Sequence, residues 1–162
     1  MTFHVPRSGT RGPLGEDWVP LVQVLAAMIT LAPEHVTVQV HTEFDRGCGP
    51  YVQTLQEDDG ALHIEAVSNE FLDPEIGPDA INTLLEMGWN PPDDDGLPNF
   101  HRLIPSEDVA PGDVAAFLVR TLRDVYLVTP RDRFECAPEE LCREIVRGDF
   151  GFLPNISKIG RA

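Results

Sequence analysis

The chain has 162 residues, of which 42% are hydrophobic and 24% are charged, and its formal net charge is −15. A chain of this size and composition is long enough for one domain with a buried core and is not typical of a disordered protein. Because 27 acidic residues face only 12 basic ones, the surface repels phosphate backbones and anionic membranes. The charge therefore argues against nucleic acid and membrane as partners. It favours cationic or amphipathic peptides as partners, or serves only solubility.

The cysteines and the apolar segments indicate a compartment. The chain has an odd number of cysteines without CxxC spacing, namely Cys48, Cys136 and Cys142. No apolar signal-peptide core follows the N-terminus, and the apolar-rich stretch 18–31 is too short to span a bilayer. These features predict a protein of the reducing cytoplasm.

Three regions follow from local composition. Residues 1–15 are rich in Gly, Pro and small polar residues without periodicity, which predicts a flexible N-terminal arm. Residues 16–148 carry the regular patterns of a single α+β domain. Residues 149–162 show no period and form a predicted C-terminal tail.

The domain begins with a predicted helix followed by strands. Apolar residues recur at helical spacing from Trp18 to Ile29, and the helix ends before Pro33. From residue 34 the period changes to two, which predicts a half-buried strand over 36–43. Two more strands are expected at 51–56 and 62–66, joined by the hairpin signal Asp-Gly at 59–60. For 51–56 the facing stays open, because apolar residues fall on both sides.

A short predicted helix, bounded by Pro78 and Gly88, leads to three consecutive carboxylates at 93–95. The triplet ends in Asp-Gly and separates a segment around Trp89 from an extended run at 97–104. This pattern predicts a hairpin tip, and the nearby prolines predict that part of the hairpin is irregular.

Two further helices are predicted, over 114–125 and 138–148. The expected order is α-β-β-β-α-β-β-α-α, with hairpins in place of alternating βα units. This order predicts an α+β fold with an antiparallel sheet of about five strands and helices packed mainly on one face.

Candidate chemistry is weak. Counting from Asp93, the EF-hand template requires a glutamate where Ile104 stands, so the triplet fits a solvated turn better than a calcium loop. The alternative function is a metal-assisted enzyme, in which the metal would be bound by His41, His63 and His101 with nearby carboxylates. No HExxH spacing supports that alternative, and no catalytic, cofactor or metal residue is predicted.

The polar face of the sheet is the candidate interaction surface. If helices cover the valine face, then five polar side chains share the other face: Gln39, His41, Gln53, His63 and Glu65. Such a face is solvated, bound to a second copy, or a docking surface for a peptide. The residues alone leave these three states open.

The succession of a first helix, a three-stranded meander, the phrase "LLEMGWNPPDDDGLPNFHRLIP" and the helix "DVAAFLVRTLRDVYLV" resembles the YbjN and type III secretion chaperone-like superfamily. The chain looks most like small acidic actinobacterial members, and the strong preference for Arg over Lys fits a GC-rich genome. The resemblance covers about residues 16–128. Its most specific residues are Gly88-Trp89-Asn90 and Pro98-Asn99-Phe100.

The resemblance implies a chaperone- or adaptor-like protein, often homodimeric, that holds a client segment without ATP. It carries no catalytic residues and implies no cofactor. The expected partner is therefore a protein or peptide client, and the expected function is binding without catalysis.

Overall fold

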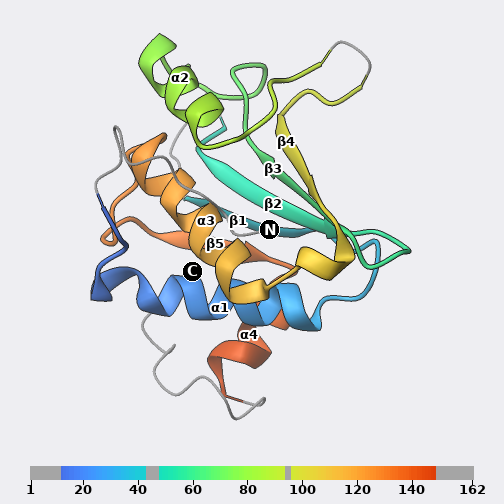
Figure 1. Ribbon diagram of the computed structural model, residues 1–162. Helices are drawn as coiled ribbons and strands as arrows, with labels where there is room; N and C mark the ends of the chain where they lie inside the picture. Colours follow the sequence, from blue (N-terminus) through green and yellow to red (C-terminus); the bar gives the residue numbers. More distant parts are fainter. Residues whose placement is uncertain (1–11, 43–47, 94–95, 149–162) are drawn as a thin grey trace.

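A computed structural model describes residues 12–42, 48–93 and 96–148 (Figure 1). Four α-helices, two short 3₁₀ helices and five strands follow one another in this part of the chain. In chain order they are η1 (Glu16–Trp18), α1 (Val19–Leu31), β1 (Val38–Thr42), β2 (Tyr51–Gln56), β3 (Leu62–Ala66), α2 (Pro78–Glu86), β4 (Phe100–Ile104), η2 (Ser106–Asp108), α3 (Pro111–Asp124), β5 (Phe134–Ala137) and α4 (Glu139–Val146). None of these helices has the length and apolarity needed to cross a bilayer.

The five strands form one antiparallel sheet in the order β4-β3-β2-β1-β5. The α+β fold and the antiparallel sheet are as predicted. The predicted Asp-Gly turn joins β2 to β3, and Gly60 has a φ of 82°, a left-handed conformation that glycine adopts without strain. Its amide donates to the Glu57 carbonyl, at 3.0 Å, and closes the turn.

One predicted strand was wrong. The segment around Trp89 contributes only a single bridge, between Asn90 and His101, because Pro91 and Pro92 have no N–H to continue a ladder. The fifth strand is instead β5, which pairs with β1 and forms the edge of the sheet opposite β4. Its four residues are too few to show a clear alternation.

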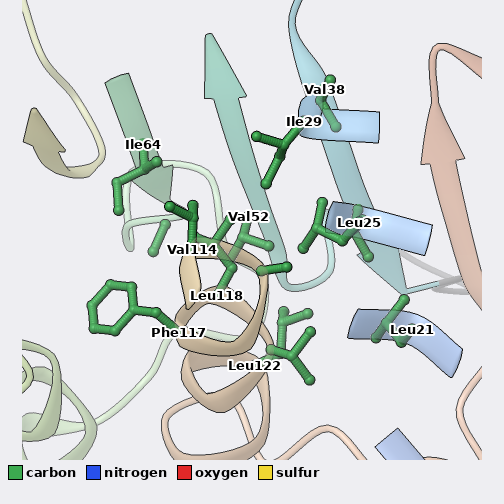
Figure 2. Packing of buried hydrophobic residues seen from close by; sticks show 14 of the residues in the cluster. Leu21, Leu25, Ile29, Val38, Val52, Ile64, Val114, Phe117, Leu118 and Leu122 are labelled. Atoms are coloured by element: carbon green, nitrogen blue, oxygen red, sulfur yellow. The ribbon is translucent and has the colours of Figure 1, made fainter. Parts of the chain in front are cut away.

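α1 and α3 pack against one face of the sheet, α2 packs on α3, and α4 packs on α1 and β5. α1 and α3 lie side by side on this face, as Figure 1 shows. Figure 2 shows Val114 and Leu118 of α3 directed at Val52 and Ile64 of the sheet. α2 and α4 add Leu84 and Ile145 to the same buried cluster.

A buried ion pair attaches the start of the described chain to α3. The Arg123 Nε lies 2.7 Å from the Asp124 Oδ1, and both side chains are buried. The same guanidinium donates to the carbonyl oxygens of Gly12 and Pro13, at 2.6 and 3.1 Å. Residues 1–11, most of the predicted arm, and residues 149–162, the predicted tail, lie outside the described residues.

Two neighbouring leucines of α2 test the packing. Leu84 is fully buried, whereas Leu85 is 43% exposed. We expect Leu84→Ala to lower the free energy of unfolding by about 3 kcal/mol, because it removes buried contacts and leaves a cavity. Leu85→Ala, the matched control, should lower it by less than about 1 kcal/mol. Urea unfolding followed by circular dichroism measures both, and equal losses would contradict this packing.

Candidate functional site

The strand registers place one set of side chains on the sheet face away from the helices. Side chains alternate along a strand, so residues paired across neighbouring strands share a face. Gln39 pairs with Gln53, Gln53 pairs with Glu65, and Glu65 pairs with His101. We call this surface the open face; it comprises Gln39, His41, Tyr51, Gln53, Leu55, His63, Glu65, His101, Leu103, Glu135 and Ala137.

The five polar residues selected from the sequence all lie on the open face. Three of them form a hydrogen-bonded row across β1, β2 and β3. Gln39 Nε2 donates to Gln53 Oε1, at 3.1 Å, and Gln53 Nε2 donates to Glu65 Oε2, at 2.7 Å. A carboxylate acceptor strengthens the second bond. The row orients half-buried amide groups that remain partly open to solvent.

Imidazole and apolar side chains occupy another part of the open face. His63 and His101 stack with 6.4 Å between ring centroids and 4° between ring planes. His63 lies between Leu55 and Leu103 in the register, and Leu103 is 58% exposed. A partner on this face would therefore meet apolar contacts beside the hydrogen-bonding row.

The three histidines do not converge on one point. His41 lies on β1 and His101 on β4, with β2 and β3 between them. Since neighbouring strands are about 4.8 Å apart, roughly 14 Å separates these two positions across the sheet. The arrangement gives no basis for the alternative of a metal-assisted enzyme that uses His41, His63 and His101.

A different group brings potential metal ligands together at the surface. In the part of the chain that the structure describes, only Glu34, His35 and Asp58 place three such atoms within 4.8 Å of one another, and all three residues are exposed. His35 Nε2 lies 2.5 Å from Asp58 Oδ1. The hydrogen bond to Asp58 and the charge of this carboxylate raise the pKa of His35. The contact is a surface ion pair between the α1–β1 loop and the β2–β3 turn.

The described part of the acidic triplet has the geometry of an exposed turn. The Asp93 amide donates to the Leu97 carbonyl, at 2.9 Å, and Asp93 Oδ1 accepts from the Leu97 amide, at 3.2 Å. Asp93 is exposed. Asp94 and Asp95 lie outside the described residues. The described residues show a turn closed at Asp93 and Leu97, preceded by the single bridge at Asn90 and not by the predicted strand.

The residues that carry the family resemblance have structural contacts. Trp89 is buried, stacks on Phe117 with 5.3 Å between centroids, and donates from Nε1 to Thr121 Oγ1, at 3.2 Å. These contacts join the end of α2 to α3. Asn99 is also buried and accepts from the Ser68 amide, at 3.1 Å.

Asn99 also connects this motif to the open face. Its Nδ2 donates to the Tyr51 hydroxyl, at 3.1 Å, and burial raises the pKa of Tyr51. The sequence left the facing of Tyr51 unassigned and did not place Leu55, His101 or Leu103 on the face. For Leu55 the Asp-Gly turn was the available signal, because it fixes the register between β2 and β3. His101 and Leu103 depend on the pairing of β4 with β3, which no local turn fixes.

A protein-family model matches most of the chain. The model of the family TY-Chap3, described as "T3SS (YopN, CesT) and YbjN peptide-binding chaperone 3", matches residues 11–133. This range includes β1 to β4 and α1 to α3 and ends just before β5. No curated protein and no solved structure matches the chain.

The surface ion pair predicts a pH dependence. Because the pKa of His35 is raised in the folded state, the contact contributes stability below the ordinary histidine pKa and loses it as pH rises through the folded value. Asp58→Asn should move the pKa of His35 down towards its ordinary value, measured by NMR titration of the imidazole protons. Glu70→Gln, at an exposed carboxylate beyond the other end of β3, is the control and should leave that titration unchanged. An unchanged His35 midpoint in Asp58→Asn would contradict the assignment.

Proposed function

The chain belongs to the TY-Chap3 family of T3SS and YbjN peptide-binding chaperones, and on this premise we propose that it holds a segment of a client protein on its open face without catalysing a reaction. The observation that carries the proposal is the one-sided packing of the sheet. The helices bury one face, and the other presents a hydrogen-bonded polar row beside exposed Leu103. An antiparallel sheet with one free face offers a broad docking surface.

The chemistry of the open face favours an extended client segment. The row from Gln39 to Glu65 crosses three strands and offers amide and carboxylate groups. Leu55 and Leu103 lie on either side of His63 and add apolar contacts. An extended segment projects its side chains alternately to two sides. The side chains on the side that faces the sheet can therefore contact both the polar row and the apolar area around Leu55 and Leu103.

Charge supports a cationic client. The chain has a net charge of −15, and Glu65 and Glu135 place carboxylates on the open face. Attraction over such a surface speeds the encounter with a basic segment and weakens as salt rises. Lysine or arginine near the apolar residues of the client would therefore improve binding.

Three further properties complete the proposal. Holding a segment requires no ATP, and the glycine-rich stretch "SGTRGPLG" lacks the GK[ST] of a phosphate-binding loop. The protein acts in the cytoplasm. It forms a homodimer, as the family resemblance implies, and light scattering after size-exclusion chromatography measures its mass in solution. A monomer at working concentration would refute the dimer and leave the client proposal intact.

A matched pair of leucine substitutions tests the open face. Extended peptides are selected from a random display library against the wild-type protein, and their Kd values are measured by fluorescence anisotropy. Leu103→Asp should weaken binding at least about tenfold, because it places a charge within the apolar contact area. Leu85→Asp, on α2, alters an exposed leucine outside the open face and should change the Kd less than about twofold.

Two outcomes would refute the proposed surface. One is an equal effect of Leu103→Asp and Leu85→Asp, and the other is a large loss with Leu85→Asp alone. A circular dichroism melt of each variant confirms that the fold is intact before binding is compared. Failure to select any salt-sensitive, specific peptide would refute the proposed client chemistry.

A further inference from the structure

Two cysteines lie in the part of the chain that follows the family match. The match ends at residue 133, whereas Cys136 lies in β5 and Cys142 lies in α4. Both side chains are half-buried and pack against the hydrophobic core. The third cysteine, Cys48, is also half-buried but bridges Leu72 elsewhere in the fold.

The local fold places the two thiols on the core side of adjacent elements. Cys136 pairs with Val40 and so faces the helices, and α4 begins three residues later and packs directly against β5. The Cys142 amide donates to the Pro138 carbonyl, at 3.1 Å, in the first turn of α4. Cys142 lies one turn before the buried Ile145 on α4, and Cys136 and Cys142 pack against the same core. Each thiol shifts the pKa of the other.

We propose that Cys136 and Cys142 form an oxidisable dithiol that reacts with a hydroperoxide to give a disulfide fastening α4 to β5. The basis is the placement of two half-buried thiols, one on a strand and one on the helix packed against it, at the same hydrophobic core. This inference is independent of the proposed peptide binding, because neither cysteine lies on the open face.

The electrostatics assign Cys142 as the attacking sulfur. The hydrogen bond from Cys136 lowers the pKa of Cys142. The same contact, together with burial, raises the pKa of Cys136. Because the thiolate is the nucleophile and oxidation follows thiolate character, the peroxide should react first at Cys142, and Cys136 then resolves the product.

The reaction balances with the peroxide as oxidant. The Cys142 thiolate attacks one peroxide oxygen, the O–O bond breaks, and a sulfenic acid forms while the leaving oxygen takes up a proton as an alcohol or water. The Cys136 sulfur, having lost its proton, then attacks the Cys142 sulfur, and the S–O bond breaks with release of water. Two thiols are oxidised by two electrons in total, and one peroxide is reduced.

The disulfide should restrain α4 against the sheet. Ile145 of α4 is only 1% exposed and contributes to the core beside α1, so local opening of α4 uncovers part of the core. A covalent link between β5 and α4 restricts that opening and reduces the conformational entropy of the unfolded chain. We expect the oxidised protein to melt roughly 5 °C above the reduced protein.

Trypsin offers a direct assay on the full chain. Cleavage after Arg133 and Arg143 leaves both cysteines in one peptide, residues 134–143. The protein is treated with hydrogen peroxide, alkylated with iodoacetamide and digested. We expect peptide 134–143 to lose two hydrogen atoms, to resist alkylation, and to recover both thiols after reduction. Cys48→Ser, the matched control, should leave this result unchanged.

Single substitutions test the order of attack. In Cys136→Ser, the remaining Cys142 should accumulate a sulfenic acid that dimedone traps. In Cys142→Ser, labelling of Cys136 by dimedone should be at least about fivefold slower, because burial still raises the pKa of its thiol and limits the access of reagents. Peptide 134–143 that remains fully alkylated under conditions that oxidise Cys48 would overturn the proposal. So would disulfides that form only between chains, or equal trapping of the two cysteines.

Discussion

The alternation of side chains along five paired strands is the constraint on which the rest of the structure depends. Val38, Val40, Val52 and Ile64 all face α1 and α3 and are buried. Once these residues are committed to the core, the register places their neighbours, among them Gln39, Gln53 and Glu65, on the opposite face. A slip of one residue would exchange the two faces. The open face is therefore a direct consequence of how the core forms.

The most specific sequence features of the family stabilise this arrangement. Trp89 connects the end of α2 to α3 through Phe117 and Thr121, and Asn99 joins Ser68 to Tyr51. These contacts hold β4, and the segment that connects α2 to β4, against the rest of the domain. The residues that carry the resemblance thus contribute to the fold, whereas the proposed function assigns the choice of client to the side chains exposed on the open face.

Periodicity made much of this fold predictable. The helices around Leu25, Leu84 and Leu118 have strong apolar patterns, and the β2–β3 hairpin has an Asp-Gly turn. β5 escaped prediction because four residues show too little alternation. The separation of His41 from His101 and the bond between Asn99 and Tyr51 depend on strand order and long-range pairing, which local patterns do not encode. The five polar residues of the candidate face were predicted from the sequence, but Leu55 was not, because the facing of residues 51–56 was ambiguous, and Leu103 was not, because its place depends on the pairing of β4 with β3.

The location of a bound segment tests the central claim most directly. Intermolecular NOEs between an isotope-labelled protein and an unlabelled selected peptide identify the protons in contact. The account predicts NOEs from the side chains of Gln53, Leu55, His63 and Leu103 to a peptide in extended conformation. NOEs confined to α1, α3 or α4, with none from these strand residues, would contradict the assignment of the open face as the binding surface.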